Sequence, residues 1–227
     1  MPSFEQLAEQ LDPAATVLLT VECQNGVVGN GVTGKDSALP ELAAQARSSG
    51  ALTQIARLVA AAHEAGVQVL HAVAERRPDG RGSNHNARLF RAARRLLVQQ
   101  HTGSRAVRIA EPIEVADEDI VVRRLHGLSP IAGTDVDALL RNLGCRTLVV
   151  TGVSANVAIP NAVFDAVNLG YTAVVPADAI AGVPPEYTPA MVRHTLALVA
   201  TVVSTDEVLA CWKGPRRSPR QTPVTRA

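Results

Sequence analysis

The sequence predicts a three-layer α/β/α fold, in which a six-stranded parallel sheet lies between two layers of helices. Six short segments carry near-continuous Val, Leu and Ile, as strands covered on both faces require. These segments are residues 16–22, 67–73, 120–125, 147–153, 172–176 and 201–204. Helical patterns separate them, and this regular alternation is typical of a doubly wound sheet.

End signals place several of the helices. Segment 51–66 has a stripe of apolar residues and stops at Gly66, a residue type that often follows a helix. Thr134 is expected to cap the helix before the fourth strand. Thr188 and Pro189 are expected at the cap and at the first position of the helix that follows the fifth strand.

The 227 residues are expected to form one domain over residues 1–212. Residues 213–227 are basic and rich in Pro, without periodicity, and are expected to be a disordered tail. Residues 75–88 form a polar loop containing Gly and Pro after the second strand, where such folds carry binding loops or subunit contacts. No internal repeat is present.

Composition excludes several classes of protein. A hydrophobic content of 47% with a net charge of +1 argues against disorder and against a dedicated nucleic-acid partner. Neither a signal peptide nor a membrane span is visible. The sequence contains three cysteines, an odd number, at the widely spaced positions Cys23, Cys145 and Cys211. This pattern predicts neither a disulfide framework nor a zinc cluster. We therefore expect a cytoplasmic protein with no membrane partner.

Charged residues and a polar turn follow three of the predicted strands. Glu22 ends the first strand, Arg124 lies at the end of the third, and the turn from Gly152 to Ala158 follows the fourth. In a parallel open sheet the ligand crevice lies beyond the carboxyl ends of the strands, near the switch in strand order. These three features are therefore expected to meet at one crevice.

Three segments resemble the isochorismatase-like hydrolases, a family of cysteine hydrolases that includes nicotinamidases and N-carbamoylsarcosine amidases. They are TVLLTVECQNG, EDIVVRRLHGLSPIAGTDVDALLRNLG and TLVVTGVSANVAIPNAVFDAVNLGYTAVVPADAIAG. The first is similar to the family's strand ending in Asp-x-Gln, the second to its catalytic Lys segment, and the third to its nucleophile turn. The resemblance covers residues 14 to about 210 and implies the Rossmann-like, isochorismatase-like fold.

The resemblance implies an active site of Asp, Lys and Cys, and all three differ in this chain. The Asp position is Glu22, the Lys position is Arg124 or, with a register slip of one, Arg123, and the Cys position is Ala158. Glutamate in place of aspartate still offers a carboxyl group for proton transfer. Arginine in place of lysine is still positively charged, and its planar guanidinium can form two parallel hydrogen bonds to a carboxylate, but it cannot release its proton. Alanine removes the nucleophile, so no acyl-enzyme forms there.

No other cysteine is expected to substitute for the missing thiol. Cys23 follows Glu22 directly, so its side chain is expected to point to the opposite face, into the core. Cys145 precedes the fourth strand at the wrong end of the sheet, and Cys211 belongs to the last helix. We interpret all three as structural.

Other residues near the predicted crevice are candidates for binding the substrate or an oxyanion. They are Gln24, His126, Ser154, Ala155 and Asn156. The turn before the helix at Ala158 can present backbone N–H groups to an anion.

Arg124 and three of the histidines can also be interpreted as structural residues. Arg124 is either a clamp for a substrate carboxylate or the structural ion-pair partner of Glu22. His71 is interpreted as a core residue, and His63 and His85 show no metal-ligand spacing.

The first hypothesis is a hydrolase that acts on a small carboxylate-bearing substrate without a covalent intermediate, as in acid-assisted hydrolysis of the vinyl ether of isochorismate. The alternative is a catalytically silent member of the family that binds a small anion. Metal-dependent hydrolysis is a third possibility, which no ligand spacing favours. No cofactor or metal is expected, and the resemblance implies a homo-oligomer.

Overall fold

The computed structural model describes residues 2–29 and 37–213. Its centre is a seven-stranded sheet in the order β3-β2-β1-β4-β5-β7, with β6 paired to β4. Every pairing is parallel. The strands are β1 Thr16–Val21, β2 Gln68–Ala74, β3 Ile120–Arg124, β4 Thr147–Val153, β5 Thr172–Pro176, β6 Ile180–Ala181 and β7 Thr201–Val203.

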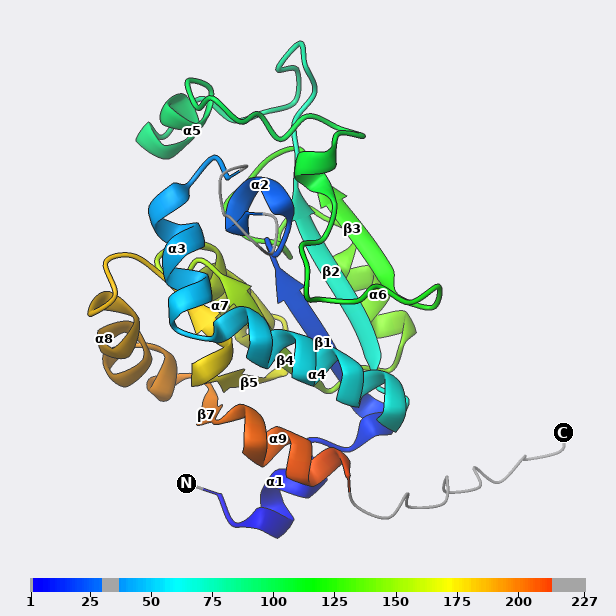
Figure 1. The fold of residues 1–227 in the computed structure, drawn as a ribbon. Coiled ribbons are helices and arrows are strands. Elements are labelled where there is room, and N and C mark those ends of the chain that lie inside the picture. The colour runs from blue at the N-terminus through cyan, green and yellow to red at the C-terminus, as the bar shows by residue number, and fades with distance from the viewer. Residues whose placement is uncertain (1, 30–36, 214–227) are drawn as a thin grey trace, which may run out of the picture.

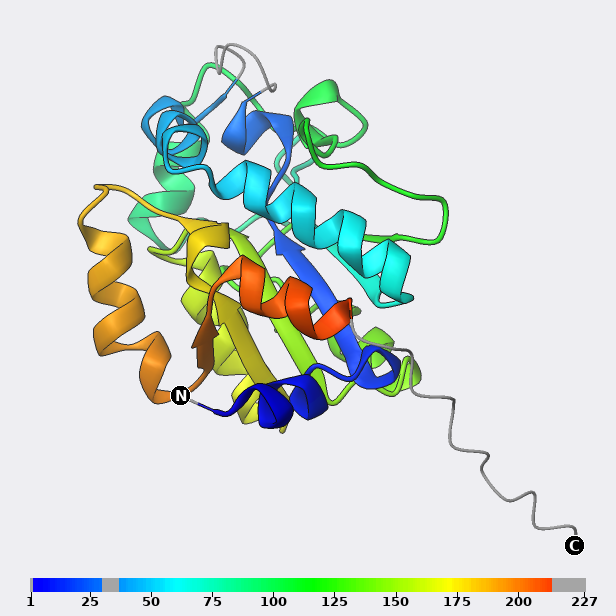
Figure 2. The same ribbon diagram turned by 60° about the horizontal axis from the view of Figure 1, so that its bottom comes forward.

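Helices cover both faces of this sheet, which gives three layers (Figure 1, Figure 2). On one face α3 (Pro40–Ser48), α4 (Ala51–Ala65) and α9 (Thr205–Trp212) pack over alternate residues of the strands, such as Leu18. On the other face α6 (Val136–Asn142) and α7 (Ala158–Asn168) pack over the intervening residues, such as Leu19. Burial on both faces explains why the strands are apolar throughout.

The shorter elements lie around this frame. They are α1 Phe4–Gln10, α2 Asn25–Val28, α5 Arg88–Ala93, α8 Tyr187–His194 and the 3-10 turns Pro13–Ala15, Arg105–Val107, Ala177–Ala179 and Leu196–Leu198. No helix within residues 2–29 and 37–213 is long and apolar enough to cross a membrane.

The three-layer fold and its six main strands are confirmed, and three details of the prediction are wrong. The sheet gains β6, whose two residues are too few to give a sequence signal. Helix α8 begins at Tyr187, so Pro189 is its third residue and not its first. Proline is tolerated there because the N–H groups of the first helical turn have no carbonyl acceptor within the helix. Asp135 occupies the N-cap of α6, although the Thr134 hydroxyl still accepts from the Val136 amide at 3.2 Å.

The predicted disordered tail lies outside the described residues, except for Lys213, which ends α9. Within the described part, the strand order turns at β1 and β4. The helices after these two neighbouring strands cover opposite faces, which makes their carboxyl ends the usual place for a ligand crevice.

Candidate active site

Glu22 follows β1 at this switch point and has an unusual backbone. Its φ of 52° makes it the only non-glycine residue with positive φ among the described residues. Its amide donates to the Ala72 carbonyl at 2.8 Å, which fixes it against β2. Left-handed backbone in a residue with a Cβ costs energy, and such residues often lie at functional sites.

Arg124, the last residue of β3, meets Glu22 directly. Because β2 lies between β1 and β3, the Arg124 side chain reaches across the end of β2. There its Nη2 donates to the Glu22 carboxylate. The Arg124 side chain is only 6% exposed, and its Nε and Nη1 atoms have no partner within the described residues. A buried guanidinium with uncommitted N–H groups is a strong anion receptor.

The neighbouring Arg123 points elsewhere. Its Nη1 lies 3.5 Å from Glu75 Oε2 and 3.4 Å from the Val107 carbonyl, and its side chain is half exposed. Of the two arginines at the end of β3, Arg124 is therefore the one beside Glu22.

Gln24 ties the end of β1 to neighbouring segments. Its Nε2 donates to the Ala74 carbonyl at 2.7 Å and to Gln100 Oε1 at 2.5 Å, and the residue is fully buried. Its Oε1 has no partner among the described residues. Gln24 thus holds the ends of β1 and β2 in place around Glu22.

The turn from β4 into α7 brings backbone groups toward the switch point. The Ser154 carbonyl accepts from the amides of Val157 and Ile159, each at 3.1 Å, and the Ala155 amide donates to Ala181 at 2.8 Å. The Asn156 side chain is bonded to Val183 through both its oxygen and its nitrogen.

The predicted oxyanion donors of this turn therefore differ in availability. The Ala155 amide is already used within the fold. Among the described residues, no backbone hydrogen bond uses the amides of Asn156 or Ala158. Ala158 is the first residue of α7 and is buried, so its amide is one of the unpaired donors of a helix N-terminus.

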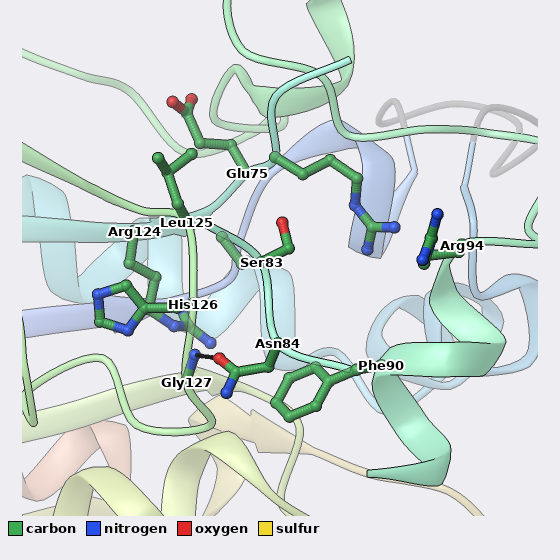
Figure 3. A pocket seen from close by; sticks show the side chains of 11 residues that line it. Glu75, Ser83, Asn84, Phe90, Arg94, Arg124, Leu125, His126 and Gly127 are labelled. Carbon is green, nitrogen blue, oxygen red and sulfur yellow. Dashed lines mark hydrogen bonds between the residues drawn. The ribbon is translucent and has the colours of Figure 1, made fainter. Parts of the chain in front are cut away.

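A pocket opens beside Arg124, between the ends of β2 and β3 (Figure 3). Its lining residues are Ala74, Glu75, Arg76, Ser83, Asn84, Phe90, Arg94, Arg124, Leu125, His126 and Gly127. His126 is among the residues that line this pocket. Most of the other lining residues come from the 75–88 loop, where the sequence suggested binding or subunit contacts, and from α5 and its end, but none of them was predicted individually.

A model of the isochorismatase domain matches residues 16–207. The chain belongs to this family. The ureidoacrylate amidohydrolase RutB of Methylobacterium radiotolerans is 28% identical over 229 positions, which cover 94% of this chain and 84% of that protein.

Solved structures agree with this membership. An isochorismatase family protein from Desulfovibrio vulgaris has a TM-score of 0.72 and 27% identity, covering 86% of this chain and 98% of that one. N-carbamoylsarcosine amidase from Thermoplasma acidophilum has a TM-score of 0.64 at 19% identity, covering 85% and 97%, and shows the fold alone.

The cysteines of this isochorismatase-family chain lie in or against its core. Burial, followed by the charge of Glu22, raises the pKa of Cys23 to about 12, and burial raises the pKa of Cys145 to about 11. The pKa of Cys211 is also raised, first by burial. Since the thiolate is the nucleophilic form, a raised pKa disfavours nucleophilic attack by each of the three thiols.

His71 is a core residue, as predicted, and belongs to a network that the sequence did not reveal. Its Nδ1 lies 2.7 Å from Thr20 Oγ1 and its Nε2 lies 3.2 Å from Asp119 Oδ2, while Asp119 Oδ1 lies 2.9 Å from His63 Nε2. His85 is exposed on the pocket loop. Within the described residues no group of three His, Cys, Asp or Glu side chains is arranged to hold a metal ion.

Proposed function

We propose that this protein is a hydrolase that acts on a small carboxylate-bearing substrate without a cysteine nucleophile. The observation that carries the proposal is the buried Arg124, whose Nε and Nη1 have no partner among residues 2–29 and 37–213 while Nη2 donates to Glu22. In this proposal the contact between Arg124 and Glu22 joins the anion receptor to the group for proton transfer.

Arg124 is the proposed clamp for the substrate carboxylate. A buried guanidinium loses hydration that only another polar group can replace, and a carboxylate replaces it with charge-assisted hydrogen bonds. The uncommitted Nε and Nη1 atoms allow the substrate to bind while the contact with Glu22 persists.

Glu22 is the proposed proton-transfer group. Its carboxylate accepts from Arg124 Nη2, so it lies next to any anion that Arg124 binds. A carboxyl group held beside a bound substrate can pass a proton to it and take one back.

For a vinyl ether such as isochorismate, hydrolysis can proceed by proton transfer and addition of water alone. Glu22 gives its proton to the methylene carbon, and the resulting oxocarbenium ion takes up water. The water's surplus proton returns to Glu22, and the hemiketal collapses to pyruvate and an alcohol. Neither a thiol nor a covalent intermediate is needed, which agrees with Ala158 at the start of α7.

The backbone at the start of α7 has a supporting role in this proposal. The amides of Asn156 and Ala158, which no backbone acceptor uses within the described residues, suit an oxygen that gains negative charge. Helix α7 adds the positive end of its dipole to the same place.

The direct test is turnover of a panel containing isochorismate, ureidoacrylate and nicotinamide by the full chain, with intact-mass measurement during turnover. We expect consumption of a carboxylate-bearing compound and no covalent adduct. Arg124→Gln should lower kcat/KM by roughly 10- to 100-fold, because one charge-assisted contact is lost.

Arg95→Gln is the control, because it removes the same charge at an exposed residue that does not line the pocket. It should stay near the wild-type rate. An adduct on a cysteine, or equal losses in both variants, would contradict the proposal.

A silent, anion-binding protein is the second candidate. It is favoured by Ala158 in the turn where the family places its nucleophile and by the direct pairing of Glu22 with Arg124, which satisfies both charges without a substrate. For this candidate, none of the panel is consumed although small carboxylates bind.

A further inference from the structure

The pocket beside Arg124 carries more positive charge than one carboxylate requires. Three arginines line it, namely Arg76, Arg94 and Arg124. Its one acidic lining residue, Glu75, turns its carboxylate away from Ser83, Asn84 and Phe90 (Figure 3), and Glu75 Oε2 lies 3.5 Å from Arg123. Because Arg124 is paired with Glu22, the excess positive charge at the pocket comes from Arg76 and Arg94.

Among the described residues, no carboxylate is a hydrogen-bond partner of the Arg76 or Arg94 guanidinium. Arg76 Nη1 lies 3.5 Å from Gln99 Oε1, and Arg94 Nη1 lies 3.5 Å from His85 Nδ1. Burial, followed by the charge of Arg94, lowers the pKa of Arg76, so the two cations are close enough to repel each other. An anion between them relieves this repulsion.

The pocket walls are held in place by backbone contacts. Arg76 is bonded to Gln100 and Thr102, each through a 2.9 Å hydrogen bond of its main chain. Asn84 Oδ1 accepts from the Gly127 amide at 2.8 Å, which joins the loop to the end of β3. The pocket therefore does not depend on α5 alone.

Arg94 and Arg124 lie on different sides of this pocket, with Phe90 and Asn84 also on its wall (Figure 3). Ser83 Oγ is buried at the pocket and has no partner within the described residues. The Ser83 hydroxyl, together with the guanidinium groups of Arg76 and Arg94, offers the hydrogen bonds and the positive charge that an oxyanion needs.

We propose that Arg76, Arg94 and Ser83 form a second anion subsite, so that the protein selects ligands with two oxyanionic groups. One group binds Arg124 and the other, a carboxylate or a phosphate, binds between Arg76 and Arg94, with an apolar spacer against Phe90. This inference rests on the proposed function, because it takes Arg124 as the first carboxylate site.

The test is a set of calorimetric titrations of the full chain with matched ligand pairs. Succinate is compared with propionate, and phosphoglycolate with glycolate, so that each pair differs by one anionic group. We expect the doubly charged member of at least one pair to bind roughly tenfold or more tightly, as a charge-assisted contact provides. The tighter pair identifies whether the second group is a carboxylate or a phosphate.

Arg94→Gln should reduce that ratio to about twofold or less, since a charged partner is lost. Arg94 is exposed, so this change leaves the fold intact, and Arg76→Gln provides a second variant. Arg95→Gln is the matched control, because Arg95 is the next residue along, is exposed and does not line the pocket. It should keep the wild-type ratio.

Equal affinities within both pairs, or the same ratio in all variants, would overturn the inference. Tight succinate binding that depends on Arg94 supports it even if the protein consumes no substrate. That combination would refute only the proposed hydrolysis.

Discussion

At the scale of single residues, Glu22 combines a backbone cost with the proposed role in proton transfer. Its φ of 52° lies in the left-handed region, and its carboxylate holds the buried Arg124. An unfavourable conformation of this kind persists only when the surroundings enforce it. Here the hydrogen bond from its amide to Ala72 and the contact with Arg124 do so.

A pair of substitutions at Glu22 isolates the backbone cost. Both Glu22→Gly and Glu22→Ala remove the carboxylate, but only alanine keeps the Cβ that opposes positive φ. We expect the glycine variant to be more stable by about 1 kcal/mol. Urea denaturation of the two variants measures the difference, and an alanine variant of equal or greater stability would contradict the backbone assignment.

At the scale of elements, the contact between β1 and β4 depends on Gly152. A Cβ at this residue would lie 2.2 Å from the Val21 carbonyl oxygen, and its φ is +112°. The two strands can therefore approach only with glycine at this point. This approach sets the position of the turn that leads to Ala158.

Gly152→Ala should accordingly destabilise the protein by about 3 kcal/mol or more, through overpacking and strain together. Gly144→Ala is the control, since its φ of +67° imposes strain but nothing lies within 4 Å of the added Cβ. It should cost only about 1 kcal/mol. Thermal or urea unfolding of both variants decides the matter, and equal costs would mean that β1 does not approach Gly152 closely.

The Asp119 network joins α4, β1 and β2 and makes stability depend on pH. Burial lowers the pKa of His71 from its ordinary value near 6.5, and this effect outweighs the opposing effect of the hydrogen bond that its imidazole makes to Asp119. The unfolded chain therefore binds a proton at a higher pH than the native state. The stabilising contribution of neutral His71 is complete above pH 6.5 and is lost as the pH falls through this value toward the folded pKa.

We predict that the urea midpoint of the wild type falls between pH 7.5 and about pH 5.5. His71→Gln should flatten this fall, because glutamine does not titrate, whereas the exposed His85→Gln should leave it unchanged. An identical fall in the His71 variant would place the titrating group elsewhere.

At the scale of the whole molecule, the elements that could be predicted from the sequence are those whose residues all lie in one kind of environment. Strands such as β4 are buried on both faces, so their composition alone reveals them. The meeting of Glu22 with Arg124 followed from the rule that parallel strands end at one edge. Membership of the isochorismatase family followed from three linked motifs.

The parts that escaped prediction depend on contacts between distant segments. Arg76 and Arg94 share a pocket, yet α5 has no buried residue and hence no apolar period that could place it. Asp119 joins two histidines from different elements, which no local spacing encodes. The positive φ of Glu22 is also a product of tertiary contacts, since its residue type does not favour it.

The central claim is that Glu22 transfers the proton while Arg124 binds the substrate, and Glu22→Gln tests it most directly. The measurement is kcat and ligand Kd of this variant beside the wild type, on whichever panel compound is consumed. The account predicts a fall in kcat of roughly 10²- to 10⁴-fold, with affinity kept or improved because Arg124 loses a competing carboxylate. A variant that keeps its turnover, or that loses affinity while kcat stays unchanged, would contradict it.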